Sequence, residues 1–558
     1  MTALGVVPVF FNAGVALLPA ILAALASLAA LVVRPGNLWR ACKARPWTAV
    51  AAVACLAGLG GLTWWTMSVF GDTARRKPAP AARGETALAA AAHIDWAAVA
   101  VEWIRQDRLA AHGTPAPKPG PVPFVSPSPL APAAVIFGHG PLRHGYAGGG
   151  SPLGLEPAWQ FPSAGSKAAE DLEGALYLAS PAVVGDAVFS AACLLDARRN
   201  YGTIFCLDAA TGRPRWTVSD HKNAQGEECD FKGFFSSPAV SADGRWLVIG
   251  QGLHDDADCE LICLDARTGR VHWLVPTPLH IEGSPAVQGD LVVAGAGAIE
   301  VGDEHRVKGH PGLVIGVRLS TGEKVWEYQL NDPESSPAVA DGVVYIGSGF
   351  NGSAVAALRT EPDEELRRRG LARLVWRTPT PYPATGAVTL VDNLLLVGCG
   401  NGDYVYADPR PSGAVIALDR KTGGVRWRAP MPDAVLGRIA VLGSRAIAAV
   451  RNGEVVALDL AGPQPGKVLW RQAVHGGKAV LAGPAFTGTY VYAVSQDGWL
   501  AVLDARDGRP VERHMLNAPG KPGELGLSLS SPTVAGGRLY VGSETGGFRC
   551  FAGKEVRP

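Results

Sequence analysis

The residues of this sequence best suited to chemistry are histidines and carboxylates gathered in loop-like segments. Four such segments, residues 220–234, 253–258, 299–311 and 403–412, lie between runs of apolar residues. Imidazole nitrogens and carboxylate oxygens are common donors to metal ions. The candidate ligands are His254, Asp255, Asp256, Asp258, His280, Glu282 and His305. Because their spacing matches no fixed ligand pattern, we favour a solvated acidic rim and predict no metal, with a metal or polar-ligand site as the alternative.

Cys229 lies in the first of these segments and Cys259 directly follows the second, so the two cysteines flank one structural unit. In an oxidising compartment, two cysteines on one face can form a disulfide. We therefore consider a Cys229–Cys259 disulfide as a candidate, with two separate thiols as the alternative. The chain has no CxxC pair and no two adjacent cysteines, which excludes the common zinc-ribbon and thioredoxin-like sites.

The elements that must position these loops form an internal repeat. Ser-Pro-Ala-Val begins a unit at Ser180, Ser237, Ser284 and Ser336. Weaker copies begin at Thr385, Arg438, Gly483 and Ser531. Successive units start about 50 residues apart, as in propeller blades. Each contains apolar strands, a tight turn that is commonly Thr-Gly, and a last strand, so the sequence predicts an all-β fold, an eight-bladed β-propeller over residues 134–558.

A tryptophan marks most of the last strands, where we expect it to cover the seam between neighbouring sheets. These structural residues are Trp159, Trp216, Trp273, Trp326, Trp376, Trp427 and Trp470, while Glu512 holds the equivalent place in the seventh unit. The eighth unit lacks a fourth strand of its own. Residues 155–161 supply one from the N-terminal side, which predicts that the ring closes on itself.

Composition agrees with this architecture and limits the partners. The 558 residues include 69 Gly and 43 Pro, yet 47% are hydrophobic, which favours many short strands joined by turns. The 51 basic residues are balanced by 50 acidic ones. With no basic field to neutralise phosphates, we predict no nucleic-acid partner.

The N-terminal part of the chain is predicted to be a membrane anchor. Residues 1–33 and 47–70 each contain an uncharged apolar stretch longer than the roughly 20 residues that cross a bilayer. The connector, residues 34–46, contains basic and no acidic residues, which predicts a cytoplasmic loop. We expect a transmembrane hairpin in the membrane, with a bacterial inner membrane as its setting. A linker over residues 71–133, with an Ala-rich helix and a Pro-rich segment, then leads to an exoplasmic, periplasmic propeller.

Two motifs carry a family resemblance over residues 137–553. One runs from Cys206 to Gly212 and is followed by Trp216, and the other joins Phe137-Gly138-His139 to Arg143-His144-Gly145-Tyr146. Both resemble the repeats and lead-in of pyrroloquinoline quinone (PQQ)-like propellers. That superfamily includes the quinoprotein alcohol dehydrogenases and the BamB-like assembly proteins. The shared residues are structural ones, so the resemblance implies the fold more specifically than any activity.

The resemblance sets the functional expectations. Quinoprotein dehydrogenases hold PQQ against a disulfide between adjacent cysteines and bind Ca²⁺ beside it. This chain has no such pair, so we predict neither cofactor and no catalytic residue. We expect a non-catalytic scaffold that binds a protein partner on its long-loop face. The alternatives are a membrane-bound PQQ-dependent oxidoreductase and an envelope propeller that binds sugars or polymers.

Overall fold

The computed structural model describes residues 145–195, 200–222, 227–253, 256–297, 312–349, 352–521 and 523–557. The chain divides into two units, Met1–Asp95 and Trp96–Pro558, and every described residue belongs to the second. The predicted hairpin and linker lie outside the described residues. Among the residues that are described, no helix is long and apolar enough to cross a membrane.

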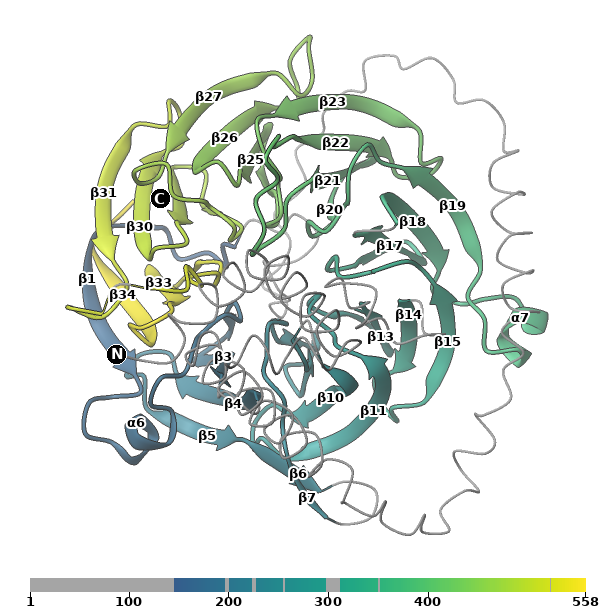
Figure 1. The fold of residues 1–558 in the computed structure, drawn as a ribbon, viewed down its shortest axis with the longest axis horizontal. Helices are drawn as coiled ribbons and strands as arrows, with labels where there is room; N and C mark the ends of the chain where they lie inside the picture. The colour runs from purple at the N-terminus through teal and green to yellow at the C-terminus, as the bar shows by residue number, and fades with distance from the viewer. Residues whose placement is uncertain are drawn as a thin grey trace, which may run out of the picture. The chain divides into compact units, whose positions relative to one another are not determined.

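The described chain forms eight four-stranded antiparallel sheets arranged as the blades of a propeller (Figure 1). Blade 1 contains β2 (Ala182–Val184), β3 (Ala187–Leu195), β4 (Asn200–Asp208) and β5 (Pro214–Val218). Blade 2 contains β8 (Ala239–Val240), β9 (Trp246–Gly250), β10 (Ala257–Asp265) and β11 (Val271–Leu279). Blade 3 contains β12 (Ala286–Gln288), β13 (Leu291–Ala296), β14 (Leu313–Arg318) and β15 (Lys324–Gln329). Blade 4 contains β16 (Ala338–Ala340), β17 (Val343–Ser348), β18 (Ala354–Arg359) and β19 (Leu374–Pro379).

The second half of the ring repeats this arrangement. Blade 5 contains β20 (Thr389–Val391), β21 (Leu394–Gly400), β22 (Gly413–Asp419) and β23 (Val425–Met431). Blade 6 contains β24 (Ala440–Leu442), β25 (Arg445–Ala449), β26 (Glu454–Asp459) and β27 (Val468–Ala473). Blade 7 contains β28 (Ala485–Phe486), β29 (Tyr490–Val494), β30 (Trp499–Asp504) and β31 (Pro510–Met515). Blade 8 contains β32 (Thr533–Ala535), β33 (Arg538–Gly542) and β34 (Phe548–Arg557), with β1 (Ser151–Phe161) as its outer strand.

Closure of the ring by the N-terminal strand is confirmed. β1 pairs antiparallel with β34 along its length, from Ser151 opposite Arg557 to Phe161 opposite Phe548. The two strands lie side by side in Figure 1 although they stand at opposite ends of the described chain. Closure leaves no blade missing a strand, which is how a propeller avoids an open sheet end.

One short hairpin and two short helices lie outside the eight blades. The hairpin β6 (Asp220–Lys222) and β7 (Glu228–Asp230) lies within the first of the long segments named above. The helices α6 (Lys167–Asp171) and α7 (Glu364–Arg368) are capped by Ser166 and Asp363, whose side chains accept backbone N–H groups. None of these elements interrupts the order of the blades.

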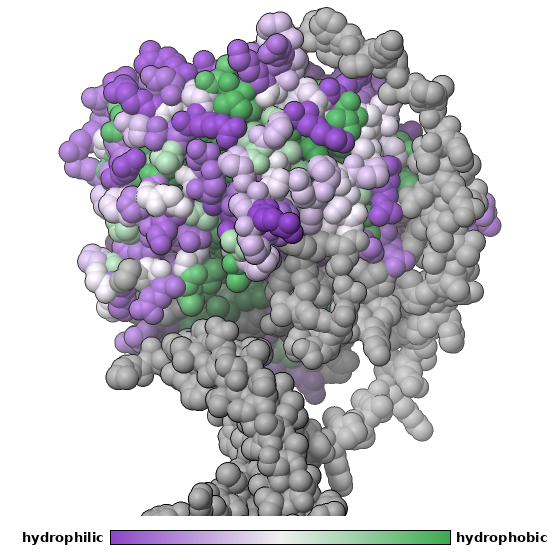
Figure 2. Space-filling view, turned by 45° about the horizontal axis from the view of Figure 1, so that its top comes forward, coloured by the Kyte–Doolittle hydropathy of each residue, from purple (hydrophilic) through white to green (hydrophobic). Residues whose placement is uncertain are grey.

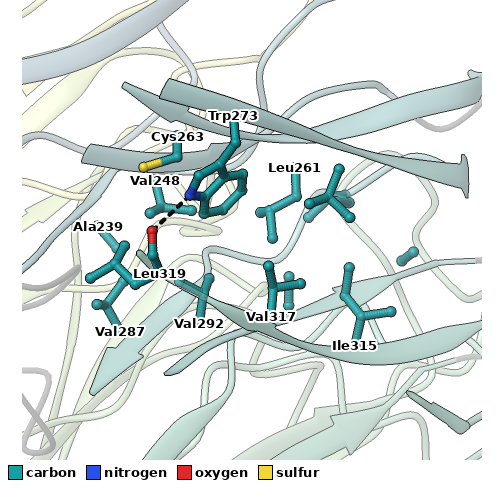
Figure 3. Close-up of a cluster of buried hydrophobic side chains, with 14 of the residues drawn as sticks. Ala239, Val248, Leu261, Cys263, Trp273, Val287, Val292, Ile315, Val317 and Leu319 are labelled. Atoms are coloured by element: carbon teal, nitrogen blue, oxygen red, sulfur yellow. Dashed lines mark hydrogen bonds between the residues drawn. The ribbon is translucent and has the colours of Figure 1, made fainter. Parts of the chain in front are cut away.

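The hydrophobic core lies in the seams between neighbouring blades. In the cluster of Figure 3, Leu261 and Trp273 of blade 2 pack with Val292 and Ile315 of blade 3. The indole Nε1 of Trp273 donates a hydrogen bond of 2.7 Å to Leu319 O across that seam. Each blade thus buries both faces, which explains the continuous apolar runs of its inner strands.

Most seams repeat this contact. The indole Nε1 atoms of Trp159, Trp216, Trp326, Trp376 and Trp470 each donate to a backbone carbonyl of the next blade, at 2.8 to 3.1 Å. Several of these rings lie against a turn glycine of that blade. A Cβ at Gly322, where φ is +76°, would come within 2.8 Å of the Trp273 ring. The Thr-Gly turn therefore needs glycine both for its positive φ and for room under the indole.

Two places differ from this pattern. In blade 5, Trp427 Nε1 is buried and finds no hydrogen-bond acceptor among the described residues. At the closing seam, Glu512 stands where the tryptophan would be, and its carboxylate accepts the backbone N–H groups of Gly154 and Leu155 in β1. A charged side chain thus ties blade 7 to the N-terminal strand.

Candidate functional site

The two faces of the ring are built from different connections. The turns between first and second strands and between third and fourth strands form one face, which we call the short-turn face. The connections between second and third strands and from each fourth strand to the next blade form the other, the long-loop face. Loops carried by a rigid scaffold are where binding residues usually lie.

A small cavity lies where the eight first strands begin, at the centre of the ring. Its volume is about 60 Å³, and its lining includes Ser180, Ser237, Ser284, Ser336, Thr385, Arg438, Gly483 and Ser531, one from each blade. Such a volume holds a few water molecules. The sequence has no adjacent cysteines, the pair that the resemblance associates with PQQ binding.

The serines at this centre form a belt of hydrogen bonds between blades. The backbone N–H of Ser180 donates to Ser237 Oγ at 2.9 Å, and Ser237 N donates to Ser284 Oγ at 3.0 Å. The same bond joins Ser284 to Ser336, Gly483 to Ser531, and Ser531 back to Ser180. The serine of Ser-Pro-Ala-Val recurs in the sequence, but its hydrogen bond to the next blade is seen only in the folded ring. It is structural.

Arg438 takes the place of the serine in blade 6. Its side chain is 1% exposed, and it donates to Pro484 O at 3.3 Å and to Pro532 O at 2.7 Å. The guanidinium thus bonds to the starts of blades 7 and 8, where it satisfies carbonyl groups that a serine could not reach.

The larger hollow lies on the long-loop face over blades 5 to 8. This groove has a volume of about 620 Å³. It is lined by Tyr404, Val405, Ala407, Asp433, Arg451, Asn452, Gly477, Lys478, Ala479, Gln496, Leu525, Gly526 and Leu527. We call it the blade 5–8 groove. Its residues come from six connections that are far apart in the sequence.

One wall is the loop that begins at Asn401. Asp403 Oδ1 accepts the backbone N–H groups of Val405 and Tyr406, which folds the loop into a tight turn. Arg451 Nε donates to Asp403 O at 2.8 Å and ties this turn to blade 6. The fixed turn leaves Val405 86% exposed. An apolar side chain held outward by polar contacts is suited to binding.

Tyr404 anchors the base of the same loop. Its hydroxyl donates to Leu436 O at 3.1 Å, and its ring meets Phe235 with centroids 5.0 Å apart. Burial raises the pKa of the Tyr404 phenol, and nearby carboxylates raise it further. The phenol therefore stays neutral and serves as a fixed part of the wall.

The opposite wall is the segment that contains Leu525 and Leu527. Their backbone N–H groups donate to the two carboxylate oxygens of Glu544, at 2.9 and 2.7 Å. Glu544 is 4% exposed, whereas Leu525 is 53% exposed. Both walls thus present an exposed apolar residue whose backbone N–H is held by a carboxylate, half-buried Asp403 on one wall and buried Glu544 on the other. On the face shown in Figure 2, hydrophobic residues form small patches among hydrophilic ones.

The candidate metal ligands are divided between described and undescribed residues. His254, Asp255 and His305 lie outside the described residues. Asp256 Oδ2 accepts Leu253 N at 2.8 Å, Asp258 is exposed, and His280 Nε2 lies 3.1 Å from Glu334 Oε1. Glu282 lines the central cavity. Within the described ranges, no three His, Cys, Asp or Glu side chains are grouped so that they could hold a metal ion.

The two cysteines of the candidate disulfide lie in β7 and β10. Cys229 is half-buried and its Sγ lies 3.7 Å from Glu227 O, while Cys259 Sγ lies 3.7 Å from Asp256 O. Burial raises the pKa of the Cys259 thiol to about 12. The disulfide stays a prediction, which mass mapping of the non-reduced protein tests.

Sequence comparison identifies the family of this ring. The profile of the family described as outer membrane protein assembly factor BamB matches residues 156–410 and 371–555. The chain belongs to this family. The match begins within β1, the strand that closes blade 8, and it supports the PQQ-like repeat expected from the motifs. No curated protein matched the sequence.

The chain also matches solved structures, each at 20% identity or less. BamB from Moraxella catarrhalis is 20% identical, with a TM-score of 0.47 over 69% of this chain and 98% of that chain. The quinohemoprotein alcohol dehydrogenase ADHIIG from Pseudomonas putida HK5 is 14% identical, with a TM-score of 0.45 over 76% of this chain and 81% of that chain. A europium-containing methanol dehydrogenase is 14% identical, with a TM-score of 0.42 over 67% of this chain and 90% of that chain.

Proposed function

We propose that this chain is a non-catalytic scaffold of the cell envelope, whose propeller binds a protein partner on its long-loop face. An N-terminal transmembrane hairpin in the bacterial inner membrane holds the propeller in the periplasm. The observation that carries the proposal is the blade 5–8 groove, where Val405 and Leu525 are exposed on walls fixed by polar contacts. Membership of the BamB family supports protein binding in general.

The groove suits a protein better than a reacting small molecule. Two exposed apolar side chains, Val405 and Leu525, are among its lining residues. Binding energy in protein interfaces is concentrated in a few such anchors surrounded by polar residues. The central cavity is much smaller, about 60 Å³. We therefore propose that the partner binds in the groove on the long-loop face and not in the central cavity.

Affinity capture from bacterial membranes tests the proposal. The tagged full-length chain is compared with Val405→Asp and with Lys421→Glu, which also introduces a carboxylate at an exposed position, in the turn between β22 and β23 on the short-turn face. We expect the same envelope protein to be captured by the wild type and by Lys421→Glu, and to be lost with Val405→Asp. Capture that survives Val405→Asp but fails with Lys421→Glu would place the partner on the wrong face.

A second arm addresses the oxidoreductase alternative. The full-length chain is incubated with PQQ and Ca²⁺ and assayed with alcohols and an artificial electron acceptor. We expect no reduction of the acceptor. Turnover that depends on both additions would contradict the scaffold proposal.

A further inference from the structure

The blade 5–8 groove combines apolar anchors with positive charge. Lys478 lies in its lining and is exposed, in the connection between blades 6 and 7. Arg451 also lines the groove, with its guanidinium bonded to the carbonyls of Asp403 and Val405. Two cations therefore stand between walls that present Val405 and Leu525.

The one carboxylate among the described lining residues does not balance these cations at the surface. Asp433 is 6% exposed, and its Oδ1 accepts the N–H of Ala434 at 2.7 Å. It serves the connection from β23 to β24. The accessible charge of the described lining is therefore positive, although the whole chain carries a net charge of only +1.

Neutral hydrogen-bonding groups complete the lining. Gln496, Gly477 and Gly526 are lining residues, and the two glycines add no side chain. Asn452 also lines the groove, but its amide is bonded to Glu454. Amide side chains and open backbone can pair with the main chain of an extended peptide. The lining thus offers apolar contact, positive charge and peptide-type hydrogen bonds.

We propose that the blade 5–8 groove binds an extended segment of the partner protein in which apolar side chains alternate with carboxylates. The apolar side chains contact Val405 and Leu525, and a carboxylate approaches Lys478. This inference rests on the proposed function, since it names the chemistry of the partner that the long-loop face takes. Charge complementarity of this kind selects the partner and speeds its association.

Peptide binding tests this chemistry directly. The full-length chain in detergent is titrated against a fluorescent octapeptide of alternating Leu and Glu, and against its Leu-Lys counterpart, with anisotropy as the readout. We expect the Leu-Glu peptide to bind at least 10-fold more tightly than the Leu-Lys peptide. Raising the salt concentration should weaken binding of the Leu-Glu peptide, because exposed charges are screened.

Variants then assign the binding to the groove. Lys478→Glu should remove the preference for Leu-Glu or reverse it, and Val405→Asp should weaken binding of the Leu-Glu peptide about 10-fold. Lys421→Glu on the short-turn face makes the same charge change as Lys478→Glu and should leave both affinities unchanged. Equal binding of the two peptides by the wild type, or an equal effect of Lys421→Glu and Lys478→Glu, would overturn the inference.

Two further results separate this inference from the proposed function. If a membrane protein is captured through Val405 but the Leu-Glu peptide does not bind, the acidic segment is wrong and the docking face stands. Sedimentation of the wild type and Val405→Asp tests a second copy of this chain as the occupant. A wild-type dimer that becomes a monomer in Val405→Asp would overturn the acidic-segment inference.

Discussion

The short-turn face and the long-loop face of this ring differ in how much they repeat. On the short-turn face, Asp208, Asp265 and Asp419 each accept the N–H of the threonine three residues later, at 2.9 to 3.0 Å. On the long-loop face, the connections have different lengths and contacts in each blade, as in the Asp403 turn and the segment held by Glu544. The repeated residues hold the ring together. The residues that do not repeat have no such structural role in every blade, so they can differ to suit a binding partner.

This difference predicts that stability and binding separate by residue. Core and turn substitutions should lower the free energy of unfolding, whereas groove substitutions should change binding with the ring intact. The following predictions examine that separation from the largest expected effect to the smallest.

Trp273→Ala should have the largest effect on stability. The indole is 8% exposed and fills the seam between blades 2 and 3. Its loss should lower the free energy of unfolding by about 3–5 kcal/mol, measured by urea denaturation. Val405→Asp, at an exposed position, should change it by less than about 0.5 kcal/mol. Equal losses in the two variants would contradict the division between the faces.

Glu512→Ala should have an intermediate effect at the closing seam. The change leaves the N–H groups of Gly154 and Leu155 without their carboxylate acceptor. An unsatisfied buried donor costs about 1–3 kcal/mol, so urea denaturation should show a loss in that range. His514→Ala is the control, because it removes the neighbour of Glu512 at 2.9 Å and keeps the carboxylate on β1. If His514→Ala costs more than Glu512→Ala, the carboxylate is not what closes the ring.

Two tryptophan-to-phenylalanine changes isolate the hydrogen bond of the indole. Trp273→Phe loses the 2.7 Å bond to Leu319 O and should cost about 1 kcal/mol more than Trp427→Phe. Trp427 Nε1 has no acceptor among the described residues, so its replacement removes a buried donor that is not satisfied. Thermal or urea unfolding of both variants measures the difference. A larger loss for Trp427→Phe would show that ring packing, and not the hydrogen bond, sets the order.

The smallest expected effect is the pH dependence of the closing seam. Burial raises the pKa of Glu512, but the N–H groups of Leu155 and Gly154 and the nearby His514 lower it more, so the net pKa lies below its ordinary value. A carboxyl whose pKa is lowered by folding stabilises the protein above its unfolded pKa and loses that contribution as the pH falls. Stability should therefore decline below about pH 4.3, the ordinary value for glutamate. The decline should be shallower in Glu512→Gln. If the free energy of unfolding changes equally with pH in the wild type and in Glu512→Gln between pH 3 and 6, Glu512 does not cause the decline.

Much of the fold could be predicted because the repeat encodes it locally. The Thr-Gly turns and the tryptophans recur with each blade, and Leu155–Phe161 could be recognised as the missing strand because the count left one blade incomplete. The structure extends this strand to Ser151 and pairs it with β34. The sequence shows Glu512 at the place where the other last strands have a tryptophan. Its bonds to Gly154 and Leu155 join residues more than 350 positions apart, so no local pattern could reveal them.

The candidate site could be predicted only as a face. The sequence placed residues 403–412 among the long loops but did not distinguish Val405, Lys478 and Leu525, which become neighbours of one groove only through the packing of blades 5 to 8. The sequence feature that could have pointed to this groove is a pair of apolar residues, Val405 and Tyr406, in an otherwise polar loop. The histidines and carboxylates that first suggested chemistry do not gather within the described residues.

Site-specific photo-crosslinking in membranes tests the central claim most directly. A benzophenone amino acid is placed at Val405 in the groove, and in a separate variant at Lys421 on the short-turn face. We predict one crosslinked envelope protein from position 405 and none from position 421, with the adduct reduced by Lys478→Glu. The same adduct from position 421, with none from position 405, would contradict a binding site on the long-loop face.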